Sequence, residues 1–305
     1  MSSEVEERIH KALATHPLER IENGYRLVHA GGAGISTLRI LAAASIPEGS
    51  TLESIVEISA EYNSAGLPPF HLTGIQRLNA WAVYGAFDVT NGRLRQTAQF
   101  SIYANEPAVH LVVQSILNAF GGQLPIGRST ALAMTSAAVL KQQRAHHGMP
   151  AQWKTPVDLE TLSAASSLIQ QRGLPAANDA TRIWSEIPLS DAAETALLQV
   201  NVAIPHPIAG AGYLATISLP MAKAPEGATE ICARLNALEM QEGDFVPRLG
   251  AWGLQAPNDV PGYACFIPAT EPMGAMHAAL IWWNARRAAW MRDRFWVPKE
   301  GLRLE

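Results

Sequence analysis

The spacing of hydrophobic and polar residues in the first third of the chain predicts strands followed by a helix. Runs of apolar and β-branched residues, separated by turn-forming Gly, Pro and Asn residues, are typical of strands. Between Thr73 and Trp81 the apolar residues instead recur three and four positions apart, which predicts a helix. The expected strands are Gly24–Ala30, Thr37–Ile46 and Ser54–Tyr62.

A hairpin and a closing helix are expected next. Asn91-Gly92 between two β-rich runs is the strongest short signal for a hairpin turn, so Val83–Thr90 should pair with Arg93–Tyr103. Asn105 is a suitable cap for the helix that follows, because its side chain can accept a hydrogen bond from the first turn. Gly121-Gly122 is expected to end that helix.

The same order of elements recurs in the second half of the chain. Arg77-Leu78-Asn79-Ala80 returns unchanged as Arg234-Leu235-Asn236-Ala237. Gly85-Ala86-Phe87 matches Gly250-Ala251-Trp252 at a slightly larger offset, and one insertion around residues 241–247 accounts for the difference. Because the matches keep their order, we interpret the chain as a tandem duplication.

We therefore predict an α+β fold with two related lobes, each an antiparallel sheet with helices. The first lobe is expected at residues 1–125 and the second at residues 180–305. A helical connector, residues 126–179, is expected between them, with helices at Thr130–His146 and Asp158–Arg172.

Composition narrows the possible partners. The chain has 305 residues, of which 23 are basic and 27 acidic, and this balance gives no electrostatic footprint for nucleic acid. Its first residues are charged and helix-periodic, unlike a secretory signal, and its longest apolar stretches are too short to cross a bilayer. We expect a cytoplasmic protein that neither binds nucleic acid nor enters a membrane.

No catalytic, cofactor or metal motif is recognisable, and we assign no residue to these roles. The nine histidines are scattered without metal-ligand spacing, although His110 and His277 are candidates for a titratable cluster between the halves. Gly31-Gly32-Ala33-Gly34 lacks the third glycine of a dinucleotide-binding loop, so a hairpin turn is expected there. Cys232 and Cys265 are expected to be small buried apolar residues.

The last predicted helix combines tryptophan with arginine. Trp283, Arg287, Trp290 and Arg294 recur at helical spacing and mix aromatic with guanidinium groups on one face. Three interpretations are open: a core helix whose arginines stack on tryptophan, a partner interface, or a membrane-surface helix. We take these four residues as the candidate partner-binding site.

The order of strands, helix, Asn-Gly hairpin and closing helix resembles the type III secretion chaperone-like superfamily, which includes small bacterial proteins of the YbjN type. The resemblance is carried best by Arg93–Phe120, which is similar to that family's last strand and closing helix. It implies α+β domains that usually pair as dimers and bind other proteins, so the two lobes would form a pseudo-dimer within one chain. The family's units are usually single, the helical middle has no counterpart there, and no functional residue is carried over.

These observations lead to two main functional hypotheses, with a structural subunit of a larger assembly as a third. The first is a non-enzymatic adaptor or chaperone-like protein with a protein partner, present as a monomer or homodimer. The duplicated unit and the aromatic-arginine helix favour it. The alternative is an enzyme or small-molecule-binding protein with its site in the cleft between the two lobes, because pockets often form between domains.

Overall fold

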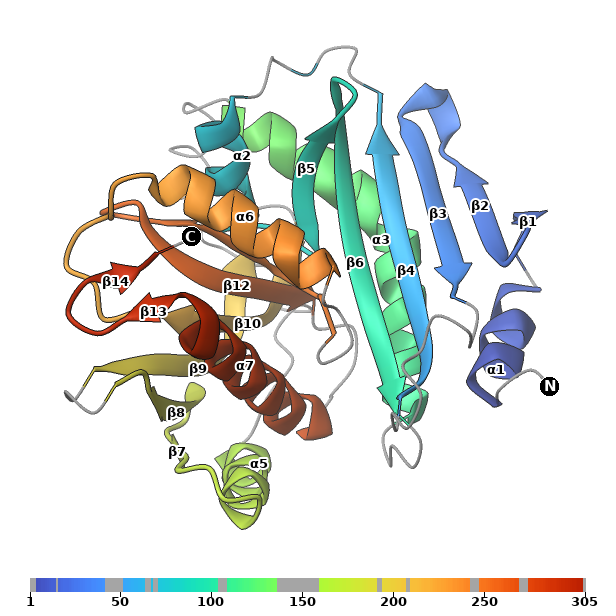
Figure 1. The fold of residues 1–305 in the computed structure, drawn as a ribbon. Helices are drawn as coiled ribbons and strands as arrows, with labels where there is room; N and C mark the ends of the chain where they lie inside the picture. Colours follow the sequence, from blue (N-terminus) through green and yellow to red (C-terminus); the bar gives the residue numbers. More distant parts are fainter. Residues whose placement is uncertain are drawn as a thin grey trace.

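The computed structural model shows two lobes that lie side by side (Figure 1). Each lobe is built on one six-stranded antiparallel sheet, so the chain has the predicted α+β fold. The structure describes residues 4–14, 16–41, 52–63, 67, 71–103, 109–135, 159–190, 194–206, 209–241, 247–268 and 274–303.

The first lobe contains sheet A, with strand order β1-β2-β3-β4-β6-β5. Helix α1, Glu4–Leu13, precedes the sheet, α2, Leu72–Asn79, connects β4 to β5, and α3, Val109–Thr135, follows it. The strands are β1, Glu19–Ile21; β2, Gly24–Val28; β3, Gly34–Ile40; β4, Leu52–Tyr62; β5, Ala86–Thr90; and β6, Arg93–Tyr103.

The second lobe repeats this arrangement around sheet B. Its helices α5, Leu159–Gln171, α6, Ala228–Gln241, and α7, Gly274–Phe295, take the places of α1, α2 and α3. From β7 the strand order is β7-β8-β9-β10-β12-β11, which is the order of sheet A. The strands are β7, Ala177–Asn178; β8, Arg182–Pro188; β9, Thr195–His206; β10, Gly210–Ser218; β11, Ala251–Gln255; and β12, Val260–Pro268. A short ribbon of β13, Trp296–Val297, and β14, Gly301–Leu302, ends the chain.

The repeated Arg-Leu-Asn-Ala segment has the same structural role in both lobes. Asn79 at the end of α2 accepts a hydrogen bond from the backbone N–H of Phe87 and donates to its carbonyl, at 2.7 and 3.2 Å. Asn236 of α6 makes the same pair with Trp252, at 2.9 and 2.8 Å. Each asparagine therefore ties its helix to the strand after it, which supports the interpretation as a duplication.

The predicted hairpins are confirmed. Asn91 and Gly92 both have positive φ, 52° and 73°, as a two-residue turn between twisted strands requires. The glycine-rich segment at Gly31 connects β2 to β3 through one short 3-10 turn rather than through a phosphate-binding helix start. Strand β1 was not predicted, since three residues carry too little periodicity to be recognised.

Helix α3 overturns one prediction. It does not end at Gly121-Gly122 but continues through Pro125 to Thr135, so the start of the predicted connector belongs to the first lobe. Tertiary packing overrides the local stop signal, because Gln123 is fully buried and donates to the carbonyl of Tyr84 at 3.1 Å. The predicted helix Thr130–His146 begins inside α3, and its part after Thr135 lies outside the described residues. The other predicted connector helix, Asp158–Arg172, corresponds to α5.

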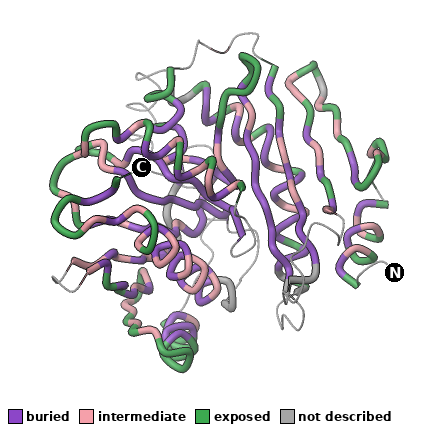
Figure 2. The backbone as a smooth tube through the Cα atoms, viewed as in Figure 1, coloured by how far each residue is buried: buried purple, intermediate pink, exposed green. Residues whose placement is uncertain are grey.

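The two lobes share one hydrophobic core. Buried residues of both sheets belong to one cluster, and Figure 2 shows buried segments in the strands of both lobes. A second, smaller cluster lies within the first lobe and includes Ile75 and Leu78 of α2. Helix α2 of the first lobe packs on β11 and α6 of the second, and Gly253 makes this approach possible. A side chain there would place its Cβ 2.6 Å from the backbone oxygen of Gln76. No helix within the described residues is long and apolar enough to span a membrane.

Candidate binding face and the joint between the lobes

Sheet A has one face covered by helices and one face open over β3 and β4. Helix α3 packs against β3, β4 and β6, so side chains such as Leu38, Ile58 and Phe100 are buried beneath it. In Figure 1 the opposite face of β3 and β4 is turned toward the viewer, and none of the described helices crosses it. We call this side the outer face of sheet A.

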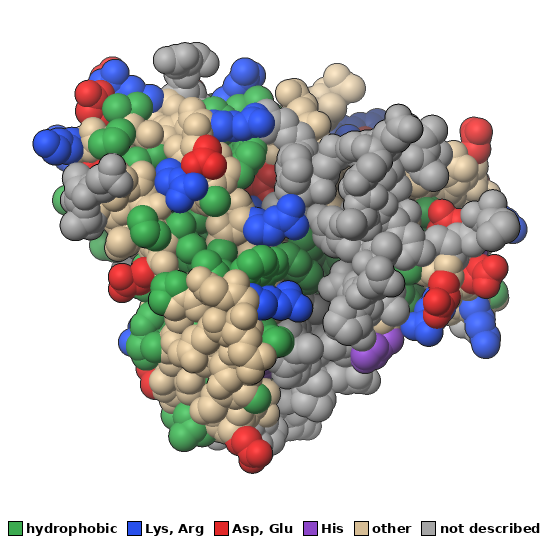
Figure 3. All heavy atoms as spheres, turned by 60° about the horizontal axis from the view of Figure 1, so that its bottom comes forward, with side chains coloured by type: hydrophobic (Ala, Val, Ile, Leu, Met, Phe, Trp, Pro, Cys, Tyr) green, Lys and Arg blue, Asp and Glu red, His purple; other side chains and the backbone are tan. Residues whose placement is uncertain are grey.

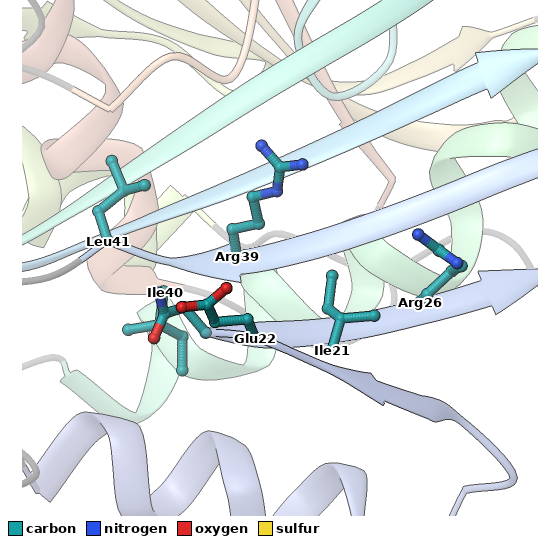
Figure 4. Close-up of a pocket in the computed structure, with 7 residues that line it drawn as sticks. Ile21, Glu22, Arg26, Arg39, Ile40 and Leu41 are labelled. Carbon is teal, nitrogen blue, oxygen red and sulfur yellow. The ribbon is translucent and has the colours of Figure 1, made fainter.

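A groove of about 560 Å³ runs over the outer face. A second depression, of about 400 Å³, lies beside β2 and the end of β3 and shares Arg39 with the groove. Figure 4 shows Arg39 and Ile40 pointing to opposite sides of β3, as alternation along a strand requires. The groove is lined by Ile35, Thr37, Arg39, Ser59, Glu61, Thr90, Asn91, Arg93 and Arg95.

Positive charge predominates in the groove, where three arginines line the walls beside one glutamate. Arg93 pairs with Glu61 at 2.9 Å, and Arg95 lies 3.8 Å from Glu57. Arg39 is exposed and forms no ion pair with any residue that the structure describes. Because exposed ion pairs contribute little free energy, Arg93 can exchange Glu61 for a carboxylate of a ligand. Arg95 is half-buried, and its 3.8 Å contact with Glu57 is longer than a hydrogen bond.

The outer face continues into the joint between the lobes. Across the sheet, Arg39 lies opposite Glu57, and Glu57 lies opposite Gln99. The side chain of Gln99 donates to Glu57 at 3.0 Å, while its backbone pairs with Arg248 of the second lobe. The joint therefore adds a short segment of the second lobe beside β6.

A buried ion pair lies on the second lobe's side of the joint. The guanidinium of Arg287 on α7 contacts Glu239 of α6 at 2.6 Å, and it also donates to the carbonyl of Pro247 at 2.7 Å. The guanidinium carbon of Arg287, Cζ, lies 3.9 Å from the ring centre of Tyr263. The other Glu239 oxygen accepts from the indole N–H of Trp252 at 3.1 Å. Burial alone would lower the pKa of Arg287, but the Glu239 carboxylate outweighs it and raises that pKa.

The four predicted partner-binding residues differ in how far they are buried. Arg287 is buried, so its guanidinium cannot reach a partner in this structure. Trp283 and Trp290 are half-buried against the core, and Arg294 is exposed. Helix α7 packs against sheet B and against α5, which together explain this burial. The side of α5 and α7 is turned forward in Figure 3, where hydrophobic side chains lie beside Lys and Arg. Partner binding by Trp283, Trp290 and Arg294 stays a prediction.

His206 of the second lobe forms a hydrogen bond to the first lobe, and its two ring contacts fix its tautomer. Its Nε2 lies 3.1 Å from the carbonyl oxygen of Trp81, which can only accept, so Nε2 carries the proton. Its Nδ1 accepts from the backbone N–H of Ala209 at 2.9 Å. The ring also packs against Phe266 and Trp81. Burial lowers the pKa of His206 to about 4, so the ring is neutral at neutral pH.

The other groups considered from the sequence are buried or dispersed. Burial raises the pKa of the Cys232 and Cys265 thiols to about 12, which makes both poor nucleophiles at neutral pH. His277 is buried against the ring of Tyr213, and His110 is exposed on α3. No group of three His, Cys, Asp or Glu among the described residues could hold a metal ion.

Comparison with protein-family models, curated proteins and solved structures finds no match to this chain. The resemblance to the type III secretion chaperone-like superfamily therefore stays an expectation from the sequence. The site is characterised by its own geometry: an open, positively charged groove on sheet A and a buried, charged joint beside it.

Proposed function

We propose that the chain is a non-enzymatic adaptor or chaperone-like protein whose outer face of sheet A binds an acidic segment of a partner protein. The observation that carries this proposal is Arg39. It is exposed in the groove between Thr37 and Glu57, and it has no carboxylate partner in the described part of the chain. A guanidinium in this setting is suited to a carboxylate, which it can bind with two parallel hydrogen bonds.

The rest of the groove supports an elongated ligand that mixes acidic and apolar residues. Arg93 and Arg95 lie on β6 at the other wall, so cationic groups line both long sides. Ile35 of β3 and Val28 of β2 lie opposite one another and are 38% and 63% exposed. They provide an apolar contact beside the cations, as binding surfaces commonly do.

A short fluorescent peptide built of glutamate and valine tests this proposal. We expect it to raise fluorescence anisotropy on binding, with an affinity that falls as salt increases because exposed charges are screened. Arg39→Ser should weaken binding about tenfold, the usual effect of losing one charge-assisted hydrogen bond. The matched control is Arg303→Ser, which removes an exposed arginine from the C-terminal end.

Two results would contradict the proposal. A peptide of lysine and valine that binds as tightly as the acidic one would show that charge does not select the ligand. Equal weakening by Arg39→Ser and Arg303→Ser would show that only the net charge of the protein matters.

A further inference from the structure

Arg248 is fixed where the two lobes meet. Its backbone N–H donates to the carbonyl of Gln99 on β6, and the N–H of Gln99 donates to the carbonyl of Arg248 at 3.0 Å. These two bonds place Arg248 beside β6 of sheet A, and its charge interacts with both members of the Glu239–Arg287 ion pair of the second lobe. The side chain is only 4% exposed.

None of the nitrogens of this guanidinium has a hydrogen-bond partner among the residues that the structure describes. Nε, Nη1 and Nη2 are all shielded from solvent and unmatched in the structure. An unmatched buried charge is strongly unfavourable, since it loses its hydration and gains nothing in return. Natural proteins satisfy almost all such groups, so a buried guanidinium with every donor unused points to a missing acceptor.

The nearby carboxylates are already engaged. Glu239 contacts Arg287 and Trp252, and Glu57 accepts from Gln99. Burial lowers the pKa of Arg248 to about 10, while Glu239 and Glu57 raise it and Arg287 lowers it further. Even so, the group is protonated at neutral pH. Arg95 lies 3.8 Å from Glu57, so the three guanidinium groups of Arg95, Arg248 and Arg287 face the two carboxylates of Glu57 and Glu239. Within the described residues, the joint therefore carries an excess of one positive charge.

Further unused donors lie near the same place in the fold. Thr97 and Ser101 flank Gln99 on the same side of β6, and both of their hydroxyl groups are buried without a partner in the described part of the chain. The amide nitrogen of Asn284 is likewise unmatched, and its oxygen accepts from Arg287 at 3.2 Å. Hydroxyl and amide donors around a guanidinium are the groups that hold an oxyanion.

We propose that the joint between the lobes binds a small oxyanion, a carboxylate or phosphate group, on the guanidinium of Arg248. The anion supplies the acceptor that Arg248 lacks and neutralises the excess charge. Because Arg248 belongs to the second lobe and the donors Thr97 and Ser101 belong to the first, a bound anion would hold the two lobes together. This anion site is separate from the groove on the outer face of sheet A, where Arg39 is the proposed contact of the acidic partner segment.

The test is thermal unfolding in the presence of sodium phosphate or sodium acetate, with ionic strength held constant by sodium chloride. At saturating concentrations of either oxyanion we expect the Tm of the wild type to rise by about 5 °C, because a ligand that binds only the folded state stabilises it. A response to phosphate alone or to acetate alone supports the proposal and identifies the anion's class.

Variants of Arg248 decide the outcome. Arg248→Met should abolish the response to both anions, and in anion-free buffer it should melt no lower than the wild type. If that variant does not fold, Arg248→Lys can be used, because it keeps one positive charge but loses the planar guanidinium. It should raise the anion concentration needed for the same rise in Tm about tenfold. The proposal is overturned if neither anion raises the Tm of the wild type, or if the Arg248 variants respond as strongly as the wild type. Arg39→Ser should keep the full response, so failure here and failure of the groove are distinguishable.

Discussion

Glu239→Gln is expected to lower the free energy of unfolding by about 3–5 kcal/mol, the usual cost of removing one partner from a buried ion pair. The substitution keeps the shape of the side chain and an oxygen for Trp252, but it removes the charge that Arg287 contacts at 2.6 Å. Arg287 and Arg248 would then share the joint with no buried carboxylate between them. Urea unfolding of the two proteins measures the difference.

Two further variants distinguish the effect of the buried charge from a nonspecific loss of stability. Glu61→Gln breaks an exposed pair with Arg93 and should cost at most about 1 kcal/mol. Replacing both members of the buried pair with apolar residues, Glu239→Leu with Arg287→Met, should recover much of the stability lost in Glu239→Gln. If Glu239→Gln is no more harmful than Glu61→Gln, the buried pair does not stabilise the joint.

The protein should lose about 3 kcal/mol of stability between neutral pH and pH 4 because of His206 alone. The pKa of His206 is about 4 in the folded protein and 6.5 for an unperturbed histidine. Between pH 6.5 and pH 4, His206 is protonated in the unfolded chain but neutral in the folded chain. The free energy of unfolding therefore falls as the pH falls. Below about pH 4 both states are protonated and this contribution levels off.

The comparison is with His206→Gln, whose amide can still donate to Trp81 and accept from Ala209 but does not titrate. Stability measured at intervals from pH 7 to pH 4 should fall more steeply in the wild type than in this variant. Parallel curves for the two proteins would mean that His206 is not held neutral in the joint.

The fold was largely predictable because its signals are local. Asn91-Gly92 predicts its hairpin through the backbone conformation that asparagine and glycine accept, and the structure confirms it. The repeat of Asn79 at Asn236 was visible as sequence and is explained by the matching bonds to Phe87 and Trp252. In contrast, the continuation of α3 depends on tertiary packing, which no local pattern reports.

The candidate site was less predictable because its residues meet only in the folded chain. Arg39 and Arg95 are ordinary polar positions of alternating strands, and only the pairing of β3, β4 and β6 places them around one groove. The burial of Arg287 had one weak signal, the apolar residues Leu280 and Met291 that share its face of the helix, seven positions before it and four positions after it. Its partner Glu239 lies on another helix, where nothing in the sequence marks it.

Site-specific photo-crosslinking, in cells that make the protein, tests most directly whether the outer face of sheet A binds an acidic segment of a partner protein. A photoreactive phenylalanine replaces Thr37 in the groove or, as a control, the exposed Gln114 on α3. We expect an adduct from position 37 only, with a crosslinked partner segment rich in Asp and Glu, and we expect Arg39→Ser to abolish that adduct. Adducts from both positions, a basic crosslinked segment, or an adduct that survives Arg39→Ser would contradict this expectation.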